Sequence, residues 1–207
     1  AVFAKLQCDG APAETADGRL GAPLPLLAQP GSGLPVHVVG RFLLRRPERE
    51  VQLQMRGSGG PDEERRVGWN RALFGCVSIA YCALLKALPA ELSIDAEAAS
   101  SMYRYWPLSS RSLEEIDELL LRPLYEQLAS EALFASLPRE LEAVKESKKL
   151  LRKLEHGVVC PANVAGRLAD FVKQHFTSFE LPAAVREQLL LAKPPGLRAF
   201  GPHELRA

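Results

Sequence analysis

The sequence predicts an α+β fold, in which a small N-terminal antiparallel sheet precedes a mainly helical region of about five to six helices. Most of the 15 glycines lie before residue 65, among short runs of β-branched or alternating apolar residues. After residue 65, apolar residues recur at helical spacing. A chain of 207 residues is also long enough to bury a sizeable core. We therefore expect a β-rich segment, 1–64, and a helical region packed on it, 65–207.

Three runs in the first segment are typical of strands. Val2–Gln7 is a candidate, and Leu34–Leu44 is rich in β-branched residues. Side chains alternate between the two faces of a strand, so Val36 and Val38 should share one side of the second run, which we expect to pack on the following helix. The third run, Glu50–Met55, alternates in the same way and predicts that Gln52 and Gln54 lie on its wet face.

Helical spacing begins in Trp69–Leu88, which is apolar nearly all round and therefore predicts a core helix. We expect its inward stripe to contain Trp69, Leu73, Cys76, Ala80, Leu84 and Leu88. A capping box at Ser112–Glu115 predicts the start of the next helix. Pro123 should perturb that helix because proline removes a backbone donor.

Three further helices are expected along the C-terminal third of the chain. They are Arg139–His156, a helix that begins at Pro161 and continues to His175, and Pro182–Ala192.

Charge and cysteine content narrow the possible partners and location. Twenty-six basic residues against 25 acidic residues leave a net charge of +1, which disfavours nucleic acid as a partner. Leu73–Leu88 is short for a bilayer span and contains a lysine, so we expect a core helix and no membrane partner. Four cysteines are too few for a disulfide scaffold and suit a reducing compartment, the cytoplasm.

No motif in the sequence predicts catalysis, cofactor binding or a metal site. The glycine-rich stretches Gly31–Gly33 and Gly57–Gly60 lack the lysine of a phosphate-binding loop. Cys76 and Cys82 are six residues apart on one helix and so point about 120° apart. Cys160, His37 and Asn163 could form a nucleophilic site only if the fold brought them together. We expect no enzyme activity, no cofactor and no metal in this chain.

An aromatic cluster offers a candidate interaction surface. Tyr103, Tyr105 and Trp106 are followed by a proline, and tyrosine and tryptophan are favoured anchors of protein interfaces. The alternative is that the cluster fills the gap between two helices.

Several segments, taken in order, resemble the repeat region of the sacsin-like chaperone family. The most specific is Leu34, Pro35, Val36, His37 and Val38, within a run from Gly33 to Leu44. Others are Trp69 and Asn70, then Ala80 and Tyr81, the aromatic cluster with its proline, and Pro123–Tyr125. Looser matches follow at Leu181–Pro182 and Gly201–Leu205, so that the resemblance covers roughly residues 20–207.

This resemblance implies a non-catalytic structural and interaction module of a chaperone or co-chaperone in the cytoplasm. It implies an ATPase-like unit upstream of Ala1 in the same parent protein, and protein clients or other chaperones as partners. Two alternatives stay open: a fragment with its own nucleotide-binding or hydrolase activity, and a helical adaptor domain unrelated to chaperones.

Overall fold

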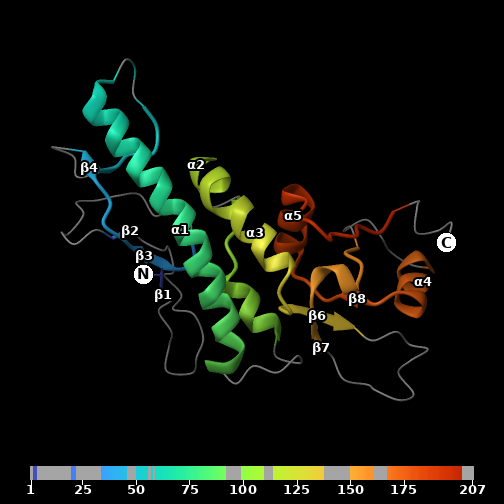
Figure 1. Cartoon of the computed structure of the whole chain (residues 1–207). Helices are drawn as coiled ribbons and strands as arrows, with labels where there is room; N and C mark the ends of the chain where they lie inside the picture. The colour runs from blue at the N-terminus through green and yellow to red at the C-terminus, as the bar shows by residue number, and fades with distance from the viewer. Residues whose placement is uncertain are drawn as a thin grey trace. The chain divides into compact units, whose positions relative to one another are not determined.

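A computed structural model describes residues 2–3, 20–21, 34–45, 50–55, 57, 59–91, 99–109, 114–137, 150–160 and 167–201. These residues form an α+β structure (Figure 1). The capping box at Ser112 lies outside them. The expected number of five to six helices stays a prediction, because several parts of 65–207 are not described.

The chain divides into two compact units. Unit 1 contains Ala1–Leu85 and Tyr105–Leu124, and unit 2 contains Lys86–Arg104 and Tyr125–Ala207. The boundary at residue 64 rests on amino-acid composition and describes a change from strands to helices. It stays a prediction, because the two compact units are defined by spatial contacts.

The strands of unit 1 form a three-stranded sheet and a separate hairpin. In the sheet, β3 (His37–Val39) lies between β1 (Val2–Phe3), which is antiparallel to it, and β2 (Leu20–Gly21), which is parallel. The expected antiparallel sheet is therefore mixed, since residues 22–36 form a connection long enough for a parallel pair. In the hairpin, β4 (Leu44–Arg45) pairs antiparallel with β5 (Glu50–Val51).

Helix α1 (Pro61–Glu91) is the longest element and begins eight residues before the expected Trp69. Proline suits the first turn of a helix, where its missing N–H is not needed, and Asp62 and Glu64 complement the helix dipole there. The stripe that is buried along α1 consists of Val67, Asn70, Phe74, Val77, Ser78, Tyr81, Cys82, Leu85 and Leu88.

This buried stripe differs from the one expected. Trp69, Cys76 and Ala80 are exposed. Because apolar residues surround this helix nearly completely, their periodicity does not show which face is buried. The expected stripe is rotated about the helix axis by about 100°, or one residue, from the buried one.

The helix after residue 113 contains an irregular turn. Segment α2 (Glu114–Ile116) leads into the π-helical η3 (Asp117–Leu121), which leads into α3 (Arg122–Ala129). The Arg122 N–H donates to the carbonyl of Asp117, five residues back. Pro123 follows at once, so the irregularity lies where proline was expected to disturb the helix.

Unit 2 contains a second three-stranded sheet. Strand β6 (Phe134–Leu137) lies between β7 (Leu150–Arg152) and β8 (Ser178–Phe179), and both pairs are antiparallel. The helix expected over Arg139–His156 is therefore wrong in its described part. Leu150 and Leu151 lie in β7, where they pair with β6, and only the short 3-10 turn η4 (Leu154–His156) follows.

Two helices complete unit 2. Helix α4 (Arg167–His175) buries Val172 against Val158 and Phe200. Helix α5 (Ala183–Ala192) agrees with the expected Pro182–Ala192, with Pro182 at its N-cap and Lys193 in the left-handed conformation at its C-cap.

Candidate functional site: the junction of α1 with the strands

The side chain of Asn70 is the centre of the junction between α1 and the strand segments of unit 1. It is fully buried. Its Oδ1 accepts from the Leu43 N–H at 2.8 Å, and its Nδ2 donates to the carbonyls of Leu43 at 2.9 Å and Gln52 at 3.0 Å. The amide thus binds both the N–H and the carbonyl of Leu43, as the backbone of a neighbouring strand would. It also binds Gln52, the residue that follows β5.

The residues on either side of Asn70 bind the same two backbone segments. The indole Nε1 of Trp69 donates to the carbonyl of Arg41 at 2.9 Å. The Arg71 guanidinium donates to the carbonyl of Leu53 at 3.4 Å. Positions 69 and 71 lie about 100° to either side of Asn70 on a helix, so three consecutive side chains reach both segments.

Gln52 is buried, contrary to the wet face expected for it. Only 5% of it is exposed, whereas Gln54 is exposed as expected. The Gln52 Nε2 donates to the carbonyl of Gln54 at 2.9 Å and to the Glu63 carboxylate. The strand ends at Val51, so the period-two alternation does not extend to Gln52.

The run from Leu34 to Val38 forms core rather than surface. Leu34, Val36 and Val38 are buried, Pro35 and His37 are partly buried, and Val39 is exposed. The expected alternation is therefore confirmed. The Phe42 ring lies 5.5 Å from the Phe74 ring of α1, so the segment that follows β3 packs on the helix.

Two of the candidate interaction residues, Tyr105 and Trp106, are buried in unit 1. The Tyr81 hydroxyl, on α1, donates to the carbonyl of Tyr105 at 2.6 Å. Tyr105 closes the 3-10 helix η1 (Ala99–Tyr105), and this bond fixes the end of that helix against α1.

The third candidate, Tyr103, is buried in unit 2 and holds the start of β6. Its hydroxyl accepts from the Ala135 N–H at 2.8 Å and donates to the Leu133 carbonyl at 3.5 Å. Burial raises the pKa of Tyr103 above the ordinary tyrosine value. None of the three aromatic side chains is exposed as an interface anchor would be. Their role as interaction residues and the alternative, that they fill the gap between two helices, both stay predictions.

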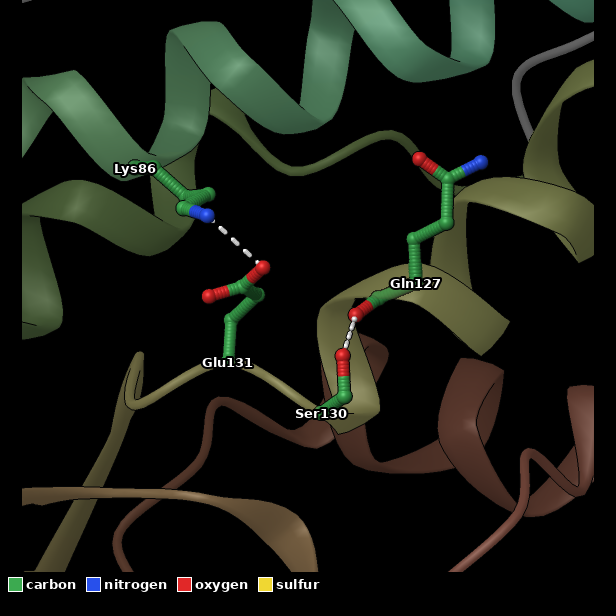
Figure 2. Close-up of polar contacts among 4 residues, drawn as sticks. All are labelled: Lys86, Gln127, Ser130 and Glu131. Atoms are coloured by element: carbon green, nitrogen blue, oxygen red, sulfur yellow. Dashed lines mark hydrogen bonds and ion pairs between the residues drawn. The ribbon is translucent and has the colours of Figure 1, made fainter.

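A surface ion pair lies at the end of α3 in unit 2. The Lys86 ammonium is 2.8 Å from the Glu131 carboxylate, and the Ser130 hydroxyl donates to the Gln127 carbonyl at 2.8 Å (Figure 2). The Ser130 bond closes the end of α3, and the ion pair joins the turn between α3 and β6 to Lys86 of α1. Both charged side chains are partly exposed, so the pair adds little to stability.

Chemical groups that could support catalysis are not assembled in the part of the chain that the structure describes. No group of three or more His, Cys, Asp or Glu side chains there is placed to hold a metal ion. Burial raises the pKa of the Cys160 thiol, although Arg186 opposes this, whereas a nucleophilic cysteine needs a lowered pKa. Asn163 lies outside the described residues. The expectations of no enzyme activity and no cofactor stay predictions.

Comparisons with protein-family models, curated proteins and solved structures find no match. By length and composition, α1 could cross a membrane, a test that the core helix of a soluble protein also meets.

Proposed function

We propose that this chain is a non-catalytic structural and interaction module of a sacsin-like chaperone or co-chaperone in the cytoplasm. It comprises a β-rich segment, 1–64, and a helical region of about five to six helices, 65–207. It continues an upstream ATPase-like unit of the same parent protein and helps to bind protein clients or other chaperones. Neither nucleic acid nor a membrane is a partner.

The observation that supports this proposal is the role of the residues that carry the resemblance. Asn70 binds the backbone of two strand segments, and Tyr81 and Tyr103 each bind backbone groups within their own unit. Val36 and Val38, in the most specific segment of the resemblance, are buried. The polar groups of Asn70, Tyr81 and Tyr103 bind the backbone of the chain itself. This favours a structural module over a catalytic one.

Nucleotide binding separates this proposal from the alternative of a fragment with its own activity. ATP with Mg²⁺ at 100 times its dissociation constant would stabilise the folded chain by about 2.7 kcal/mol. We expect no change in the melting temperature of the chain with ATP and Mg²⁺, and no phosphate release. A nucleotide-dependent shift would contradict the non-catalytic assignment.

Client binding separates the proposal from an adaptor unrelated to chaperones. We expect the full chain to reduce the light scattering of an enzyme that is heated in its presence, in a manner that saturates with the amount of chain added. An equal amount of serum albumin is the control. Scattering no lower than with albumin would contradict the chaperone role.

A further inference from the structure

The face of α1 opposite to its buried stripe is apolar and exposed. Its residues follow helical spacing: Trp69, Ala72, Cys76, Ile79 and Ala83, hereafter the Trp69 face. Trp69 is 47% exposed and Ile79 is 63% exposed, large values for such side chains. Gly68 and Gly75 lie at its margin, and a Cβ at either would meet nothing within 4 Å. Small residues between two protruding apolar side chains allow another helix to approach closely.

The Trp69 side chain is held in place, although half of it is exposed. Its indole N–H is fixed on the Arg41 carbonyl, and Leu43, which is held by the neighbouring Asn70, is 41% exposed. An aromatic side chain that is fixed before binding loses little conformational entropy when a partner covers it.

The described charges on the Trp69 side of α1 include Asp62, seven residues before Trp69, but this carboxylate is paired with Arg65. From Arg65 to Leu85, α1 contains three arginines and no acidic residue. Arg41 is exposed and makes no ion pair with any described residue, while Arg65, one turn before Trp69, pairs with Asp62 at 3.1 Å. Complementary charges select partners and speed association, so a cationic margin favours an acidic partner.

We propose that the Trp69 face is a docking surface for an acidic amphipathic helix of a partner protein. The apolar side of that helix covers Trp69, Ile79 and the small residues between them, and its carboxylates approach Arg41. A lipid surface fits less well, because the face has only two large side chains to insert, Trp69 and Ile79, among small ones. This inference rests on the proposed function and specifies the partner class.

The test uses two labelled 18-residue helical peptides. Both have leucine at positions i, i+3, i+4 and i+7; one has glutamate at the other positions and its twin has lysine. We expect the glutamate peptide to bind the full chain at least about tenfold more tightly by fluorescence anisotropy, and the difference to shrink as salt screens the charges. It should also protect Trp69 from iodide quenching, whereas Trp106, the only other tryptophan, is buried in either state.

Three variants locate the binding. Ile79→Glu and Arg41→Glu change exposed side chains, and each should weaken the glutamate peptide at least about tenfold. Leu191→Glu, at a residue of α5 that is 72% exposed, is the matched control and should leave binding unchanged. Equal affinity of the full chain for the two peptides would overturn the proposal. So would equal affinity of the Ile79→Glu and Leu191→Glu variants for the glutamate peptide.

Two other occupants would also overturn it. One is a dimer in analytical ultracentrifugation that Ile79→Glu dissociates, and the other is binding to phosphatidylcholine–phosphatidylserine vesicles that Ile79→Glu abolishes. Client scattering distinguishes the two proposals: if Ile79→Glu still suppresses scattering fully, the proposed function stands and the Trp69 face is not its surface.

Discussion

At the scale of single residues, an amide in the middle of an apolar helix is costly to bury unless its polar groups find partners. Asn70 meets this condition with three hydrogen bonds to the backbone of Leu43 and Gln52. Tyr103 meets it in unit 2 with two. Such side chains fix which backbone segment lies on which helix, something that apolar contacts alone specify less sharply.

Replacing Asn70 tests this role. Asn70→Leu keeps a similar volume but leaves the N–H and carbonyl of Leu43 and the carbonyl of Gln52 without their partner. We expect the free energy of unfolding to fall by about 3 kcal/mol or more. Trp69→Phe, which removes one hydrogen bond at an exposed side chain, should cost about 1 kcal/mol. Urea denaturation measures both, and equal losses would contradict the central position of Asn70.

Two buried tyrosines predict how stability depends on alkaline pH. Burial raises the pKa of Tyr103 and of Tyr125 in the folded chain. Above about pH 10, the ordinary tyrosine pKa, the unfolded chain releases protons that the folded chain keeps. The folded state then binds more protons, so its stability is full below pH 10 and falls as pH rises beyond it.

Denaturation between pH 8 and 11.5 tests this dependence. Tyr125→Phe should make the alkaline decline shallower, whereas wild type and variant should show the same, nearly flat dependence between pH 8 and 9. A decline of the same steepness in both proteins would show that Tyr125 is not responsible.

At the scale of elements, the segments that follow β3 and β5 pack on α1 in unit 1. Val38→Asp would place a carboxylate at a fully buried position of β3, and we expect a loss of several kcal/mol. Gln52→Asp should also destabilise, because it removes the amide that donates to Gln54 and Glu63. Gln54→Asp, at an exposed position, is the control and should stay within about 0.5 kcal/mol. Equal melting temperatures for Val38→Asp and Gln54→Asp would contradict the packing.

The same elements show what the sequence could predict. The alternation of Val36 and Val38 predicted the buried side of β3, because one face of a short strand meets water. The buried stripe of α1 could not be predicted from its apolar residues, because they surround the helix. Asn70 and Tyr81 lie eleven residues apart and thus on one face, and these two polar side chains were the signal that marked the buried side. β7 was missed because its pairing with β6 depends on contacts distant in sequence, which local periodicity does not contain.

At the scale of the whole molecule, the residues that carry the proposed resemblance to the sacsin-like family are spread over both units. Asn70 and Tyr81 act within unit 1, and Tyr103 acts within unit 2. In each unit the resemblance falls on side chains that join secondary-structure elements. This distribution supports the proposed role of a structural module.

Amide hydrogen exchange of the full chain tests most directly the claim that these motif residues hold the fold together. The Leu43 N–H has its hydrogen bond to a side chain, Asn70, and that bond should protect it from exchange. We predict that Leu43 exchanges many times more slowly than an unstructured peptide, and that Asn70→Ala removes this protection while the amides of α5 stay protected. A Leu43 amide that exchanges at the unstructured rate in the wild-type chain would contradict the account.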